Sequence, residues 1–85
     1  MSKRLFSSAK VTTALERGGF TLDRQKGSHG CFVRERPSGG HDLVVIPLGE
    51  REIPKGTLQA ALKTGNVDYE EFLSWTKVKR KGRRK

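Results

Sequence analysis

Apolar residues follow a helical spacing near the start of the chain. Within residues 7–17, three apolar side chains fall at positions i, i+3 and i+4, which predicts a short helix with a narrow buried stripe. The stripe consists of Val11, Ala14 and Leu15. We expect Ser7 or Ser8 to cap the first amides of this helix. The pair Gly18 and Gly19 allows the positive φ angle that commonly ends a helix.

Two further helical patterns occur in the second half of the chain. Residues 51–66 predict a helix with Pro54 in its first turn, where the missing amide hydrogen has no helical partner. Its expected buried face consists of Ile53, Leu58, Ala61 and Leu62. In residues 67–75, Asp68 and Glu71 have the spacing of a capping box, which predicts a short final helix. The residues expected to face inward from it are Tyr69, Phe72 and Leu73.

Between the first two helical patterns lie three stretches with strand character. Residues 20–25 alternate apolar and polar positions, which predicts a half-buried strand. Residues 31–36 are rich in strand-forming side chains. Residues 43–47 form a continuous apolar run that is too short for a helix, and this run predicts a central or well-covered strand ended by Pro47. Because short glycine-containing turns separate these stretches, we expect an antiparallel meander.

This order of elements predicts an α+β fold with a three-stranded antiparallel sheet. We expect the two main helices to pack together on one face of the sheet and to leave the other face open to solvent. Residues 1–76 are expected to form this single domain, because a chain of 85 residues is long enough for one small core. Residues 77–85 have the composition of a disordered basic tail.

Positive charge is concentrated in two parts of the chain. The net charge is +9, and residues 77–85 contain seven basic residues and no acidic one. Residues 1–34 contain seven basic and two acidic residues, whereas residues 35–76 contain four basic and seven acidic ones. Basic clusters attract nucleic-acid phosphates through counterion release, so this distribution points to a nucleic-acid partner. The alternative for the tail is a solvated extension that only keeps the protein in solution.

Composition excludes several classes of protein. No apolar run approaches the roughly 18 residues that a membrane helix requires, so we expect no membrane association. The first ten residues lack the apolar stretch of a secretory signal. The single cysteine, Cys31, cannot form an internal disulfide or a cysteine-based zinc site, and we expect it to be a small core residue. We therefore expect a cytoplasmic protein with no metal and no other cofactor.

The stretch Lys-Gly-Ser-His-Gly at residues 26–30 stands between the first two predicted strands and carries the best candidate for chemistry. Histidine exchanges protons near neutral pH, since its ordinary pKa is about 6.5. RNA cleavage needs a base that deprotonates a 2′-hydroxyl and an acid that protonates the leaving 5′ oxygen. His29 is the candidate for such a proton transfer. Gly27 would let a phosphate approach the backbone, and Ser28 adds a hydroxyl donor. The cations nearest in sequence are Arg24, Lys26 and Arg34.

A plain hairpin turn is the competing interpretation of this stretch, and residue chemistry alone favours it, because glycine and serine are common turn residues. Ser28 and His29 do not form a nucleophile–base pair, since adjacent residues of an extended chain point to opposite sides. His41 lies in a second turn-rich stretch, where an exposed histidine carries no signal. Trp75 follows an apolar helix face and is better explained by packing than by base stacking.

A longer set of residues resembles a known family. The stretches LERGGF, RQKGSHGCF, VVIPLGEREIPKGTLQAALK and EEFL are similar to those of the HicA (YcfA-like) toxins. These toxins are the mRNA interferases of HicA–HicB toxin–antitoxin systems. The likeness spans roughly residues 7–73. It is specific because Gly-Ser-His between two strands is combined with Glu-Ile-Pro-Lys-Gly-Thr-Leu at the second main helix.

The resemblance implies a fold like that of the double-stranded RNA-binding domain and a metal-independent endoribonuclease that cleaves mRNA and arrests growth. It matches the family's essential histidine to His29 and the small residues before it to Gly27 and Ser28. Lys55, in the second motif, is a further candidate RNA contact. A HicB-type antitoxin is the implied partner, so we expect a monomer when the protein is alone and a hetero-oligomer with the antitoxin. The stretch after Pro47 lacks the additional histidine of many members, which leaves the second proton-transfer group open.

Two other functions remain open from the sequence. A non-catalytic RNA-binding module would share the fold and the basic tail, and would contact phosphates and 2′-hydroxyls without cutting the chain. A protein that acts mainly through contact with an antitoxin would use the open sheet face or a sheet edge. An inactive, degenerate toxin would have the same sequence pattern.

Overall fold

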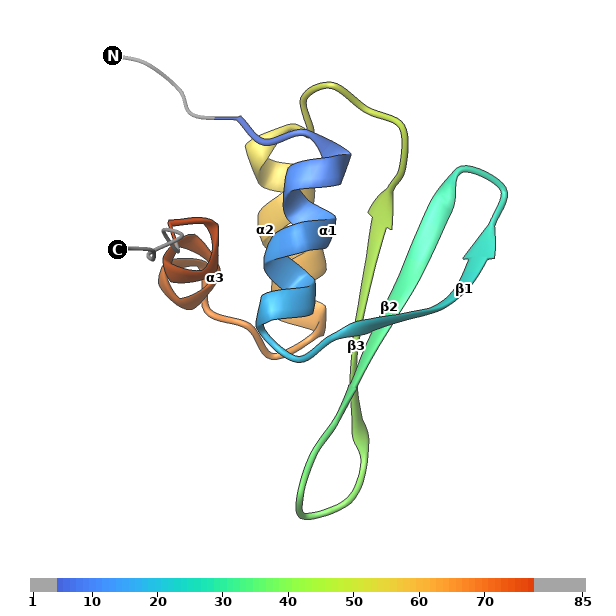
Figure 1. The fold of residues 1–85 in the computed structure, drawn as a ribbon, viewed down its shortest axis with the longest axis vertical. Helices are drawn as coiled ribbons and strands as arrows, with labels where there is room; N and C mark the ends of the chain where they lie inside the picture. Colours follow the sequence, from blue (N-terminus) through green and yellow to red (C-terminus); the bar gives the residue numbers. More distant parts are fainter. Residues whose placement is uncertain (1–4, 78–85) are drawn as a thin grey trace, which may run out of the picture.

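The computed structural model describes residues 5–77. Its elements, in chain order, are α1 (Ser8–Arg17), β1 (Thr21–Lys26), β2 (His29–Glu35), β3 (His41–Pro47), α2 (Lys55–Thr64) and α3 (Tyr69–Thr76). The strands form one antiparallel sheet in the order β1-β2-β3, and the helices lie together to one side of it (Figure 1). The predicted α+β class and element order are confirmed. The predicted disorder of the basic tail falls almost wholly outside the described residues.

The ends of the two main helices follow the predicted chemistry except at Pro54. The Ser7 side chain accepts a hydrogen bond from the Lys10 amide at 3.1 Å, which makes Ser7 the N-cap of α1. Gly19, just after α1, has a φ angle of 96°, a conformation that costs glycine little. Pro54 occupies the N-cap of α2 rather than its first turn, and Gly65 ends that helix.

The core lies between the helices and the sheet face that they cover. From the sheet it receives alternate residues of the two strands next to the helices: Phe32 of β2, and Val44 and Ile46 of β3. From the helices and their flanks it receives Phe6, Val11, Ala14, Leu15, Phe20, Ile53, Leu58, Leu62, Val67 and Phe72. The helical stripes predicted from the sequence therefore face the core, except that Ala61, Tyr69 and Leu73 are only partly buried against it.

The positions of two strands differ from the sequence-based predictions. All six residues of β1 are exposed, and Leu22 is 50% exposed, so the prediction of a half-buried strand is wrong. β1 is the edge strand away from the helices and makes few contacts with them, and Phe20 is buried just before the strand begins. The prediction of a central or well-covered β3 is also wrong, because β2 is central and β3 leaves Leu43 and Val45 exposed.

Two further expectations about single residues are corrected. Cys31 is not a core residue; it is partly exposed, because the strand alternation turns its neighbour Phe32 toward the helices instead. Asp68 does occupy the N-cap of α3, but its side chain makes no capping hydrogen bond, so the capping box is absent. Aromatic packing, and not a capping box, stabilises this helix. The centre of the Phe72 ring lies 5.7 Å from that of the Phe6 ring in an edge-on contact.

Trp75 has the packing role that was expected of it. Its ring lies 6.4 Å from the ring of Phe72 and 6.5 Å from that of Phe20. A Cβ atom at Gly18 would overlap the indole, so a glycine is required at this position for α3 to approach the end of α1. The Arg17 guanidinium donates to the Trp75 carbonyl at 3.1 Å and joins the same two helices.

Candidate functional site

The candidate site begins with a tight turn between β1 and β2. Only Gly27 and Ser28 separate the strands, and Lys26 pairs directly with His29. Gly27 has a φ angle of 57°, which favours glycine, and the Gln25 side chain donates to the Gly27 carbonyl at 3.0 Å. His29 is thus the first residue of β2 and not a loop residue. Its backbone is held by strand pairing, whereas a loop residue would lack that restraint.

Strand register places two of the predicted basic residues, Arg24 and Lys26, on the same face as His29. Directly opposed residues of an antiparallel pair share a face of the sheet, and Lys26 lies opposite His29. Arg24 lies opposite Cys31, one position further along the same face. Both cations are exposed, and Arg24 also makes an exposed ion pair with Asp23 at 3.3 Å. Such a pair is weak in water, so it leaves the Arg24 side chain able to bind another anion.

The other side of the turn is supported by the end of β3. His29 pairs with Pro47 across β2 and β3, so the histidine lies between two strands. The residue after the proline continues this pairing, because the Leu48 amide donates to the Ser28 carbonyl at 2.6 Å. In Figure 1, this end of the sheet lies beside the loop between β3 and α2 and near the first turn of α1.

The structure does not bring every predicted RNA-contacting residue to this place. The Arg34 side chain lies on the helix-covered side, where its guanidinium binds Asp42 at 2.9 Å, the Gly18 carbonyl at 3.2 Å and the ring of Phe20 at 4.5 Å. Lys55 begins α2, and its ammonium lies 5.4 Å from the centre of the Tyr69 ring. The hairpin therefore collects Arg24, Lys26, Gly27, Ser28 and His29, but neither Arg34 nor Lys55.

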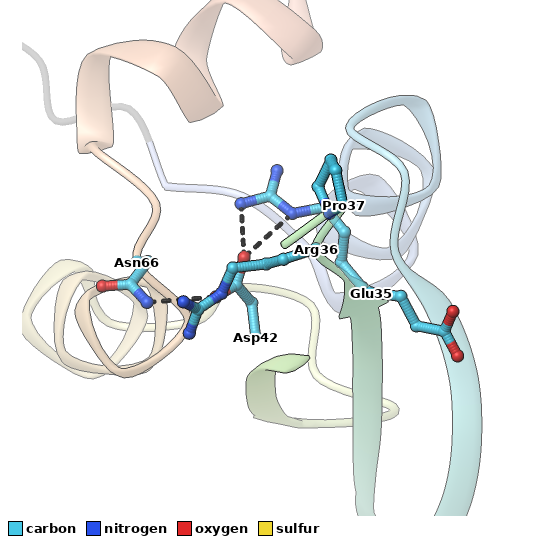
Figure 2. Close-up of a pocket in the computed structure, with 6 residues that line it drawn as sticks. Glu35, Arg36, Pro37, Asp42 and Asn66 are labelled. Atoms are coloured by element: carbon cyan, nitrogen blue, oxygen red, sulfur yellow. Dashed lines mark hydrogen bonds and ion pairs between the residues drawn. The ribbon is translucent and has the colours of Figure 1, made fainter. Parts of the chain in front are cut away.

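A second polar cluster lies at the opposite end of the sheet. Figure 2 shows a surface hollow in which Arg36, just after β2, and Asn66, the second residue after α2, lie beside Asp42 of β3. Arg36 contacts one carboxylate oxygen at 2.9 Å, and the Asn66 amide donates to the same oxygen at 3.0 Å. Arg34 binds the other oxygen. Because these cations already neutralise the carboxylate, the hollow is a structural ion-pair network and a poor candidate for catalysis.

This network predicts a specific pH dependence of stability. The hydrogen bond from Asn66, followed by that from Arg34, lowers the pKa of Asp42 below its ordinary value of 3.8. A carboxyl group whose pKa is lower in the folded state stabilises the fold above its unfolded pKa and loses that contribution as the pH falls. We expect Asp42→Asn to be less stable than the wild type at pH 7, with a difference that narrows below about pH 4. Urea unfolding at several pH values measures the difference in the free energy of unfolding between the two proteins. A difference that does not change with pH would contradict the lowered pKa of Asp42.

An apolar strip on the open face was not anticipated from the sequence. It consists of Cys31, Val33, Leu43 and Val45, which pair across β2 and β3 and lie on the same face as His29. Leu43 is 42% exposed and Val45 is 38% exposed. The continuous apolar run at residues 43–47 concealed this strip, because a run without polar residues gives no indication of which face is buried.

Other kinds of site find no support in the described residues. Within residues 5–77, no group of three or more histidine, cysteine, aspartate or glutamate side chains could hold a metal ion. The helices of this part of the chain are all too short or too polar to cross a membrane. The remaining candidate is the exposed histidine that strand pairing places beside a lysine.

The fold and this site define a small α+β domain whose open sheet face presents His29 beside two cations, with the second histidine, His41, at the other end of the sheet. A family model of the HicA toxin of bacterial toxin–antitoxin systems matches residues 8–67, from the first turn of α1 to the residues after α2. The chain belongs to this toxin family, which implies an antitoxin as its partner. No curated protein matches the chain. Helix α3 follows the matched region.

Proposed function

We propose that the protein is a metal-independent endoribonuclease that binds and cleaves mRNA and thereby inhibits translation and growth. The observation that carries this proposal is the pairing of His29 with Lys26 on the open sheet face of a member of the HicA toxin family. An exposed histidine can reach a ribose 2′-hydroxyl, and the lysine beside it can contact the neighbouring phosphate. The exposed positions of both side chains leave them accessible to a long substrate such as RNA.

The proposed reaction is an internal transphosphorylation. His29 accepts the proton of a 2′-hydroxyl, the resulting oxygen attacks the adjacent phosphorus, and the bond to the 5′ oxygen breaks. Lys26 stabilises the negative charge that develops on the phosphoryl oxygens. The exposed site gives water access to the leaving 5′ oxygen, which takes up a proton from the solvent. The products are a 2′,3′-cyclic phosphate and a 5′-hydroxyl.

The decisive test is to incubate the purified protein with an mRNA transcript in the presence of a chelator and to map the new ends. Cleavage that persists with the chelator and produces 2′,3′-cyclic phosphate ends supports the proposal. RNA that is retained by the protein but stays intact would favour the alternative, a non-catalytic RNA-binding module with the same fold.

Lys26→Ala tests the proposed phosphate contact. We expect the variant to cleave RNA about 10- to 100-fold more slowly, because a cation placed beside the developing charge is lost. Lys26 is exposed, so the melting temperature should hardly change. Lys63→Ala, at an exposed position of α2, is the matched control and should cleave at the wild-type rate. A large loss of thermal stability in Lys26→Ala would assign the lysine a structural role instead.

We further propose that the antitoxin is of the HicB type and that it covers the open face around His29. The strip formed by Cys31, Val33, Leu43 and Val45 supports this, because exposed apolar residues on a sheet commonly mark a protein interface. The cations beside the strip suit an antitoxin surface that combines apolar and acidic side chains.

Val45→Asp tests this interface. We expect the variant to bind the antitoxin at least about tenfold more weakly, since an unpaired carboxylate would be buried in the complex. Gln59→Asp adds the same charge at an exposed position of α2 and serves as the control. Titration of each purified variant with the antitoxin measures the two dissociation constants. Equal constants for Val45→Asp and the wild type would place the antitoxin elsewhere.

A further inference from the structure

We infer that Ser8 is a positioning residue for His29, acting through the loop that follows β3; this inference rests on the proposed function. Ser8 belongs to the first turn of α1 and is far from the hairpin in sequence. It is only 4% exposed, which is unusual for a serine at the start of a helix. Its hydroxyl is directed toward the chain segment that supports the hairpin turn, rather than toward the helix amides.

Three hydrogen bonds join Ser8 to that segment. The Ser8 hydroxyl donates to the Pro47 carbonyl at 2.7 Å and accepts from the Glu50 amide at 2.9 Å. The Ser8 amide donates to the Glu50 carbonyl at 2.9 Å. The side chain and the backbone of one residue thus hold both ends of residues 47–50. A substitution that removes the hydroxyl leaves the Pro47 carbonyl and the Glu50 amide without these partners.

The same segment holds the turn that presents His29. Leu48, between the two residues bound by Ser8, donates its amide hydrogen to the Ser28 carbonyl at 2.6 Å. That carbonyl belongs to the planar peptide unit that joins Ser28 to His29. The orientation of this unit, together with the φ angle of His29, sets the direction in which the His29 side chain leaves the backbone. A shift of residues 47–50 would be transmitted to the imidazole through this peptide plane.

Side-chain packing provides a second link between the loop and the turn. A Cβ atom at Gly30 would lie 3.1 Å from the Leu48 side chain, so Leu48 packs closely over the backbone of the residue after His29. Pro47 also pairs with His29 itself across the strands. The loop therefore contacts the chain before, at and after the histidine.

The neighbouring serine provides a matched control. Ser7 caps α1 by accepting a hydrogen bond from the Lys10 amide at 3.1 Å, which is a contact within the helix. Ser7→Ala removes a hydroxyl from the same turn, and its capping bond leads only to helix α1. A loss of α1 stability alone would thus affect both variants, whereas a loss of His29 orientation would affect Ser8→Ala.

The first measurement is RNA cleavage by the full chain under conditions in which every variant is fully folded. We expect Ser8→Ala to lower kcat by about 10- to 100-fold with little change in KM, because a reacting group displaced by about 1 Å loses rate at this scale. Ser7→Ala should stay within about twofold of the wild-type kcat, as a helix cap acts on stability and not on geometry. Should Ser8→Ala fail to fold, Ser8→Cys keeps a side chain of the same shape, slightly larger, that hydrogen-bonds weakly, and it should lower kcat in the same direction.

The second measurement reports geometry without activity. We expect Ser8→Ala to shift the imidazole NMR signals of His29 and to speed hydrogen exchange at the Leu48 amide. His41 pairs with Glu35 at the other end of the sheet, so its signals should stay in place. Ser7→Ala should leave both histidines and the Leu48 amide as in the wild type.

The outcomes separate this inference from the proposed function. If the wild type cleaves RNA and Ser8→Ala retains its kcat and its His29 signals, the positioning role is wrong while the ribonuclease stands. If the wild type does not cleave RNA, the proposed function fails. The NMR comparison then still decides whether Ser8 orients His29: unchanged His29 signals would overturn the inference and shifted ones would support it.

Discussion

Replacement of His29 by alanine is expected to lower the rate of RNA cleavage by about 10²- to 10⁴-fold and to abolish growth arrest when the protein is produced in bacteria. The size of the effect follows from the loss of the base that we propose deprotonates the 2′-hydroxyl. The imidazole is exposed and does not contribute to the core, so the variant should fold as the wild type does. Mapping of transcript ends and growth curves after induction measure the two effects.

His41→Ala is the matched control for this experiment. It removes the other histidine of the chain, at an exposed position of β3 in the end of the sheet away from the turn. We expect it to cleave RNA and to arrest growth at the wild-type level. If His29→Ala is equally toxic and produces the same transcript ends, His29 does not transfer the proton and the site must be sought elsewhere.

Replacement of Phe72 by alanine should produce the largest loss of stability, about 3–5 kcal/mol. The side chain is fully buried in α3, and its ring contacts Phe6, Tyr69 and Trp75. Alanine would leave a cavity at the point where α3 meets α1. A domain of this size is stable by only about 5–15 kcal/mol, so a substantial fraction of the variant should be unfolded at 37 °C.

Urea unfolding followed by circular dichroism measures this loss. Glu70→Ala, at an exposed position of the same helix, should change the free energy of unfolding by less than about 0.5 kcal/mol. The comparison also tests whether α3, which lies after the matched residues 8–67, is an integral part of the fold. Wild-type stability in Phe72→Ala would show that it is an appendage.

The helices could be predicted from the sequence because each one carries its own periodic signal. The stripe of Val11, Ala14 and Leu15 and the glycines after α1 are local features, and the structure confirms them. The Asp68–Glu71 spacing was equally local but misleading. The contacts of Phe72 with Phe6 and Trp75 account for the placement of α3, and spacing along the chain does not reveal such contacts.

The burial of the strands was harder to predict, since it depends on the order of the strands in the sheet and on where the helices pack, and not only on each strand's own residues. The alternation in β1 indicated a buried face, yet the strand lies outside the area that the helices cover. The apolar run of β3 indicated a central strand, yet half of its apolar side chains face solvent. Both errors arise because the sequence does not state which strand becomes the edge.

The candidate site was predictable to the extent that it is local. Residues 26–29 lie close together because a hairpin joins neighbours in sequence. Arg34 was expected there from its proximity in sequence, but it lies near the other end of β2, on the opposite face, and Asp42 binds it. The support from Ser8 joins residues about 40 positions apart, with a separation of 39 to Pro47, and no sequence pattern indicated it.

The exposed position of β1 has a consequence for genetic selection. Cells that survive induction of this toxin should carry two separable classes of inactivating substitution. One class falls in residues 24–29, where the side chains are exposed; these variants should accumulate as intact protein and still be captured by antibodies against the native fold. The other falls in the core around Phe72 and Leu62; these variants should be removed by cellular proteases. The amount of toxin protein in the surviving colonies would therefore distinguish substitutions that impair catalysis from substitutions that impair folding, without purification of any variant.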